Sequence, residues 1–223
     1  MGPPELTETT IRYLYATTWL PSDTSEDIVA VPGGATKAID TAGNLLHIAL
    51  WNLRRLGAME FEQLRPVEEE YVRVLGGRSF SRFELRDSTL RMPGLEGALL
   101  RAAASVEPFE GRIQRGIQRL SQEDEHGVRR LVSALDLDNR SPSDTVCNHC
   151  FAEASAAGLV KAKGRIFRAV VFTDMAAVET LREHHDELRA ARGAYLEAEP
   201  ELTTAVISDC LRTVADAYNP DLD

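Results

Sequence analysis

Apolar residues recur at three- and four-residue steps over several stretches of the chain, and this spacing predicts helices. The strongest pattern spans residues 36–56 and stops at Gly57, a residue type that commonly ends a helix. Further helices are expected over residues 5–20, 95–104, 110–120, 126–137, 144–157 and 201–218, and a long polar helix is expected over residues 175–197. The sequence therefore predicts a mainly α protein.

Short segments in which apolar and polar residues alternate follow two of these helices. Residues 58–64, 71–75 and 80–85 come after the helix that stops at Gly57 and predict two or three antiparallel strands, and residues 159–172 come after the helix that stops at Gly158. Alternation with a period of two predicts half-buried strands. A further short strand is expected at residues 28–31. The expected fold is therefore mainly α with short β-hairpins.

The order of helix, glycine and hairpin occurs twice along the chain, which suggests a duplication. A helix followed by a hairpin resembles the winged-helix arrangement, in which an earlier helix and the wing bind a partner. The polar segment 138–143, DNRSPS, is the clearest linker. We therefore predict two helix-plus-hairpin, winged-helix-like modules, residues 1–137 and 138–223, which could pack as one globule.

The start of the first predicted helix lacks a complete capping box. Thr7 can act as the capping residue, but Thr10 stands where a capping box has Glu or Gln. A carboxylate at that position normally accepts the backbone N–H of the capping residue. The sequence therefore predicts a weakly held helix start.

The 223-residue chain has a formal net charge of −10, and its apolar fraction of 43% is ordinary for a soluble globular protein. Non-specific affinity for nucleic acid comes mainly from Lys and Arg, so an acidic chain disfavours it. No apolar run reaches the roughly 18 residues that a membrane-spanning helix needs. The N-terminus shows no basic segment followed by an apolar one, so no secretory signal is visible. We expect a cytoplasmic location.

Basic residues gather in two places that could bind an anion or an acidic partner. The predicted hairpin carries four of them between apolar residues: Lys161, Lys163, Arg165 and Arg168. A predicted helix carries three more at steps that share one helical face: Arg112, Arg115 and Arg119. Exposed charges of this kind also occur on ordinary solvated surfaces. We predict these two sets as binding residues, with a protein partner or an anionic membrane surface favoured over nucleic acid.

Three cysteines provide the remaining candidate chemistry, and two of them, Cys147 and Cys150, form a C-x-x-C pair. A structural zinc site needs four ligands, and few others are available near this pair. Two cysteines on one apolar helical face are typical of a core, so we interpret them as core residues; a metal or redox site is the alternative. No nucleophile elbow or H-E-x-x-H motif occurs. The sequence predicts no cofactor and gives no positive sign of an enzyme.

Two regions resemble a known family in their pattern. Residues 42–64, AGNLLHIALWNLRRLGAMEFEQL, read as a helix and a strand, and residues 146–214 read as helix, hairpin, helix and helix. Both are similar to the Golgi phosphoprotein 3-like family, including its bacterial members. The resemblance implies a mainly helical fold and a peripheral membrane adaptor that binds phosphoinositide. The family has arginines at the start of the helix before the later hairpin, where this chain has Ser143, Asp144 and Thr145.

The pattern, the charge and the resemblance together predict a non-catalytic binding or adaptor protein. Two alternatives stay open at this point. The first is a tandem winged-helix regulator that binds nucleic acid. The second is a metal or redox protein that uses Cys147 and Cys150.

Overall fold

The computed structural model describes residues 6–18, 28–29, 35–64, 80–106, 131, 134–135, 142–163, 169–173, 176–177, 180–181, 190, 193 and 197–218. The longer helices in this part are α1 (Glu8–Thr18), α2 (Ala35–Arg55), α4 (Gly94–Ser105), α7 (Pro142–Ala156) and α9 (Pro200–Tyr218). The strands are β1 (Ile28–Val29), β2 (Met59–Leu64), β3 (Phe80–Leu85), β4 (Val160–Lys163) and β5 (Ala169–Phe172). The predicted mainly α fold with short β-hairpins is confirmed.

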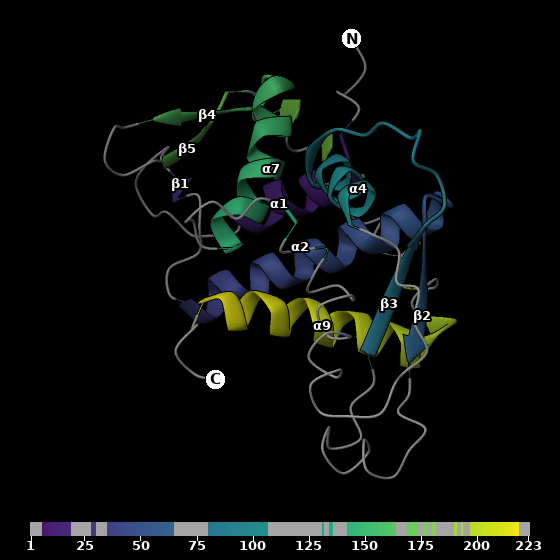
Figure 1. Cartoon of the computed structure of the whole chain (residues 1–223). Helices are drawn as coiled ribbons and strands as arrows, with labels where there is room; N and C mark the ends of the chain where they lie inside the picture. Colours follow the sequence, from purple (N-terminus) through teal and green to yellow (C-terminus); the bar gives the residue numbers. More distant parts are fainter. Residues whose placement is uncertain are drawn as a thin grey trace.

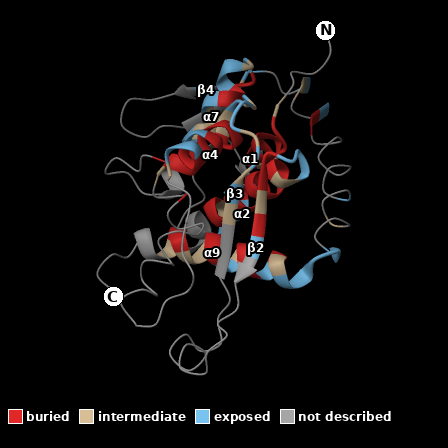
Figure 2. Cartoon of the chain, turned by 45° about the vertical axis from the view of Figure 1, so that its right-hand side comes forward, coloured by how far each residue is buried: buried red, intermediate tan, exposed pale blue. Residues whose placement is uncertain are grey.

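The second helix, α2, occupies the centre of the structure (Figure 1). It packs against α1, α4, α7 and α9, and α9 runs beside it over much of its length. Its inward positions, among them Leu46, Leu50 and Leu53, are fully buried. Figure 2 shows that buried residues also line the faces of the helices that surround α2. The apolar spacing that predicted this helix therefore marks the faces that meet its neighbours.

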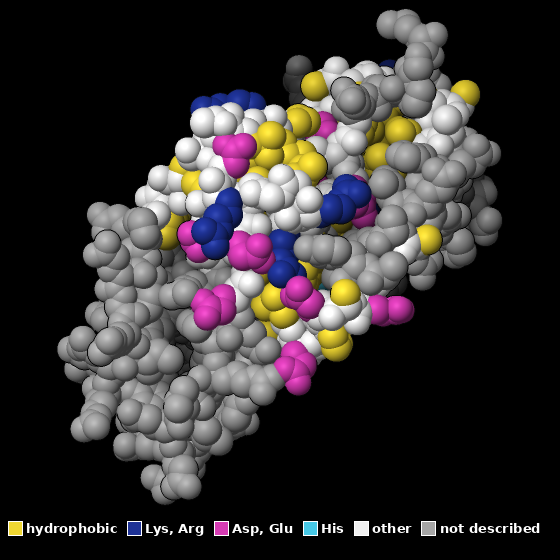
Figure 3. Space-filling view, turned by 90° about the vertical axis from the view of Figure 1, so that its right-hand side faces the viewer, with side chains coloured by type: hydrophobic (Ala, Val, Ile, Leu, Met, Phe, Trp, Pro, Cys, Tyr) yellow, Lys and Arg dark blue, Asp and Glu magenta, His cyan; other side chains and the backbone are white. Residues whose placement is uncertain are grey.

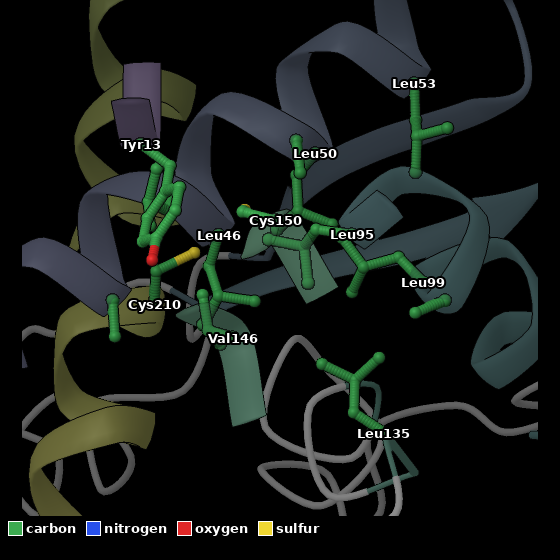
Figure 4. Packing of buried hydrophobic residues seen from close by; sticks show 14 of the residues in the cluster. Tyr13, Leu46, Leu50, Leu53, Leu95, Leu99, Leu135, Val146, Cys150 and Cys210 are labelled. Atoms are coloured by element: carbon green, nitrogen blue, oxygen red, sulfur yellow. The ribbon is translucent and has the colours of Figure 1, made fainter. Parts of the chain in front are cut away.

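One buried cluster contains residues from both predicted modules (Figure 4). Leu46 and Leu50 come from α2, Leu95 comes from α4, and Val146 and Cys150 come from α7. Burying one side chain of this size contributes about 1.5–3 kcal/mol relative to leaving it in water. The two predicted modules share this core. The division of the chain at residue 137 into two modules stays a prediction.

The strands form two antiparallel sheets, one with the order β1-β5-β4 and one that pairs β2 with β3. The small strand β1 joins the later hairpin, with Ile28 opposite Val170. The β2–β3 hairpin packs on α9 and α2. Each hairpin therefore follows its own helix in sequence, while β1 connects the beginning of the chain to the second hairpin. Among the described helices, none combines the length and the apolarity needed to cross a membrane.

The end of α2 is fixed by Gly57, which adopts a left-handed conformation with φ of 69°. Its N–H donates to the carbonyl of Arg54 at 2.8 Å, and the N–H of Ala58 donates to the carbonyl of Leu53 at 2.9 Å. These two bonds form a Schellman motif. Directly after β3, the N–H of Arg86 donates to the carbonyl of Ala58 at 2.8 Å, which ties the end of the hairpin to the end of the helix.

The end of α7 repeats this arrangement at Gly158, whose φ is 75°. The N–H of Gly158 donates to the carbonyl of Ser155, and the N–H of Leu159 donates to the carbonyl of Ala154, both at 3.0 Å. Directly after β5, the N–H of Thr173 donates to the carbonyl of Leu159 at 2.9 Å. The helix, the glycine cap and the hairpin thus form one unit that occurs twice with the same hydrogen bonds.

We expect Gly57→Ala and Gly158→Ala each to lower the free energy of unfolding by about 1 kcal/mol, because only the left-handed conformation opposes the new methyl group. A Cβ at either position meets no atom within 4 Å. The matched control is Gly193→Ala, a helical position that is equally open and has no positive φ. This change should be neutral or stabilising by up to about 1 kcal/mol. The measurement is chemical denaturation of the three variants. An equal change in the free energy of unfolding in all three would show that the left-handed conformation of Gly57 and Gly158 is not the cause.

Candidate functional site

The predicted hairpin site lies on the sheet formed by β1, β5 and β4. Lys161 is exposed in β4 and pairs with Val171, while its neighbour Val160 is buried. Lys163 ends β4, where its backbone pairs with Ala169. The other predicted binding residues lie outside the described part of the chain: Arg165, Arg168, Arg112, Arg115 and Arg119.

The strand β4 is the outer member of its sheet (Figure 1). Among the described strands it pairs only with β5, so the backbone groups on its other side have no strand partner within that set. Such an edge can accept an additional strand from another chain. Lysines on an edge strand also discourage pairing between like edges. The hairpin therefore combines a backbone edge that is unpaired among the described strands with exposed positive charge at Lys161.

The part of the surface that carries β2 and β3 has a different character, because basic and acidic side chains lie next to one another there (Figure 3). Arg54 binds the carboxylates of Glu60 at 2.6 Å and Glu199 at 2.7 Å. The guanidinium group of Arg54 also lies 5.1 Å from the centre of the Trp51 ring. These contacts fasten the end of α2 to β2 and to the residues before α9, so Arg54 has a structural role.

The three cysteines form no disulfide and lie inside the core, as the sequence predicted for Cys147 and Cys150. Figure 4 shows Cys150 and Cys210 among apolar side chains. Burial raises the pKa of Cys150 and of Cys210 well above the ordinary thiol value. A thiol held in its protonated form is a weak nucleophile and a weak metal ligand. Within the described residues there is no group of three or more His, Cys, Asp or Glu side chains that could hold a metal ion.

A polar cluster that the sequence did not reveal lies where α1, α4 and α7 meet. The carboxylate of Glu153, on α7, accepts the backbone N–H of Thr7 at 2.6 Å and the Thr7 hydroxyl at 2.8 Å. It also accepts the Thr10 hydroxyl at 2.6 Å. The backbone N–H of Thr10 donates in turn to the Thr7 hydroxyl at 3.3 Å. Glu153 therefore completes the capping box of α1 from another helix, a contact that the sequence did not predict.

The backbone at Gly94 allows this contact. Gly94 has a φ of 61°, and a Cβ built on it would lie 2.0 Å from a carboxylate oxygen of Glu153. No other residue type leaves room for the carboxylate in this position. The residue type at the start of α4 is therefore restricted by Glu153, which lies 59 positions later in the chain.

A second carboxylate, Glu96, lies in the first turn of α4 and is fully buried. One of its oxygens accepts the Thr9 hydroxyl at 2.5 Å and the side-chain N–H of Asn52 at 3.0 Å. Within the part of the chain that the structure describes, the other oxygen, Oε2, has no hydrogen-bond partner. Burial raises the pKa of Glu96, and the nearby charge of Glu153 adds to this shift; the donors Thr9 and Asn52 and the backbone N–H of Glu96 itself oppose it. Burial wins because the charged form loses its water and gains partners on one oxygen only.

Asn52, which binds Glu96, and Glu153 follow one symmetrical pattern. They occupy the same position in the two repeated units, five residues before Gly57 and Gly158. Each reaches the first turn of a helix that precedes the other unit: Asn52 contacts α4, and Glu153 contacts α1. The cluster is shielded from water, so it holds helices together and offers no surface to a substrate. The shared spacing from a helix-ending glycine is the one sequence signal that could have drawn attention to this pair.

Comparisons with protein-family models, with curated proteins and with solved structures find no match.

We expect Gly94→Ala to lower the free energy of unfolding by roughly 3 kcal/mol, more than Gly57→Ala does. The new methyl group adds the same conformational cost and also displaces the Glu153 carboxylate from its donors. A double-mutant cycle with Glu153→Ala tests this cause, because two independent changes would simply add. In the Glu153→Ala background, Gly94→Ala should cost only about 1 kcal/mol. An unchanged cost in that background would show that Gly94 does not serve Glu153.

Proposed function

We propose that this chain is a non-catalytic binding protein, and that it binds an acidic protein segment along the outer edge of β4. The observation that carries the proposal is the position of β4: it is the outermost described strand of its sheet, and it displays an exposed lysine. An extended segment that adds to such an edge gains backbone hydrogen bonds, and its side chains then supply specificity.

Charge favours an acidic partner over a second copy of the same hairpin. If two β4 strands paired with each other, they would bring Lys161 and Lys163 of both copies together. Like charges on facing positions are unfavourable, whereas acidic residues opposite these lysines are favourable. The chain as a whole carries a net charge of −10, so the basic hairpin contrasts with an acidic molecule. This contrast supports a partner that is selected by charge.

An anionic membrane surface is the competing partner, and the resemblance to the Golgi phosphoprotein 3-like family favours it. A membrane would attract the lysines but would offer no backbone groups to the strand edge. Nucleic acid is a weaker competitor, because the net charge of the chain opposes it. The three partners can be separated by experiment.

The test is a titration of the full chain with a peptide of alternating Glu and Val, with a Lys and Val peptide, with phosphatidylserine vesicles and with duplex DNA. We expect binding of the acidic peptide alone, weakening as salt is raised. NMR shifts should appear at the backbone amides of β4 residues. N-methylation of alternate peptide amides should abolish binding, because it removes the hydrogen bonds to the edge and keeps the charge. Binding of vesicles or DNA in place of the peptide would contradict the proposed partner.

The variant Lys161→Glu/Lys163→Glu should weaken binding of the acidic peptide by roughly tenfold, since each exposed ion pair contributes up to about 1 kcal/mol. It should also gain affinity for the Lys and Val peptide. The matched control is Arg91→Glu/Arg101→Glu, which makes the same change in net charge at exposed positions away from the hairpin. Equal losses in both double variants would show that bulk charge, and not the β4 edge, determines binding.

A further inference from the structure

The first turn of α1 is held by two buried carboxylates that differ in whether both of their oxygens accept hydrogen bonds. Both oxygens of Glu153 accept hydrogen bonds, from Thr7 and Thr10. Glu96 accepts its hydrogen bonds on Oε1, whereas Oε2 is buried without a partner among the described residues. A buried carboxylate oxygen without a donor is strongly unfavourable when it is charged and much less so when it is protonated. The geometry therefore favours a proton on Glu96.

Within the described residues, the groups that face Glu96 give it no positive charge. From α7 it is faced by the Glu153 carboxylate, which carries the same charge, and by the thiol of Cys150. From α1 and α2 it is faced by the neutral side chains of Thr9 and Asn52. Arg101 acts on His149, and Arg55 lies 3.7 Å from Glu8 and donates to Asn52 Oδ1 at 3.1 Å, so Arg55 reaches Glu96 only through the Asn52 amide. Among the described residues, an ionised Glu96 would therefore stand beside Glu153 without a cation in direct contact.

The first turn of α1 is the element that can open to relieve this repulsion. It provides the described hydrogen bonds to Glu153 and the bond from Thr9 to Glu96. It also lies close to the start of the described chain, and helix ends open more readily than helix centres. Movement of Thr7 to Thr10 away from α4 and α7 would admit water to both carboxylates.

We propose that a proton on Glu96 locks the first turn of α1 into the core, and that losing this proton opens the turn while the rest of the fold stays closed. Below the ordinary carboxyl range, near pH 4, the group is protonated whether the turn is closed or open, and pH has no effect. As pH rises, the open form loses its proton first, because burial in the closed form raises the pKa of Glu96. The closed form is therefore destabilised progressively as pH rises through and above this range.

The test is amide hydrogen exchange of the full chain, followed by NMR from about pH 5 to about pH 9 and corrected for the intrinsic rate at each pH. The reporters are the amides of Thr10 and Ile11, which donate to the Thr7 hydroxyl and the Thr7 carbonyl. The reference is the amide of Leu50, in the middle of α2. In the wild type we expect the protection of the reporters to fall at least about tenfold over this range while the reference keeps its protection.

The matched variant is Glu96→Gln, which keeps the shape and the acceptor for Thr9 and Asn52 but cannot ionise. Its reporter amides should keep the same protection across the whole range. In a second variant, Thr9→Val, the fall in protection should continue to higher pH and become larger, because the lost hydroxyl stabilised the ionised form of the closed turn and its loss raises only the closed-form pKa of Glu96. The proposal is overturned if Glu96→Gln shows the wild-type pH dependence. It is equally overturned if the reporters and Leu50 lose protection together, or if the protection of the wild-type reporters does not change with pH.

Discussion

The carboxylate of Glu153 is the contact on which the N-terminal half of the packing depends. It satisfies the first turn of α1 from a residue 146 positions away, and so it fixes the place where α1 can begin. It also restricts the turn before α4 to glycine, because the carboxylate occupies the space of a side chain at position 94. A buried charge is tolerated only where donors surround it, and Thr7 and Thr10 meet this demand. Three segments far apart in sequence therefore depend on one another through a single group.

The same logic explains why the two repeated units do not separate in space. Each unit ends its helix with the same glycine motif and the same bond back from its hairpin. The helices that precede the units pack on both units, since α1 and α4 each contact α2 and α7. Asn52 and Glu153 make the polar contacts between the units from equivalent positions. One is neutral and the other acidic, so the repeat has kept its geometry while its chemistry has diverged.

Local patterns were enough to predict most of the elements. The spacing of apolar residues located α2 and α9 to within one residue at each end, and alternation located β3 over the same residues that form it. Gly57 and Gly158 were predicted as helix ends, and both adopt the left-handed conformation. In the candidate binding site, the exposure of Lys161 and its place in a hairpin strand agree with the prediction. The buried cluster could not be predicted, because Glu96 and Glu153 look like ordinary surface charges in sequence and only contacts with Thr7, Thr9, Thr10 and Asn52 reveal their role.

The long reach of the Glu153 contact has a consequence for how the chain is made. During synthesis, the residues of α1 leave the ribosome early, but the group that completes the cap of this helix follows 146 residues later. At about 5–20 residues per second, this delay is roughly 7–30 s. During that interval, Ile11, Tyr13 and Leu14 have neither the completed cap nor α7 to bury them. The nascent chain therefore exposes an apolar, uncapped segment for seconds, which is long enough for a chaperone to bind it.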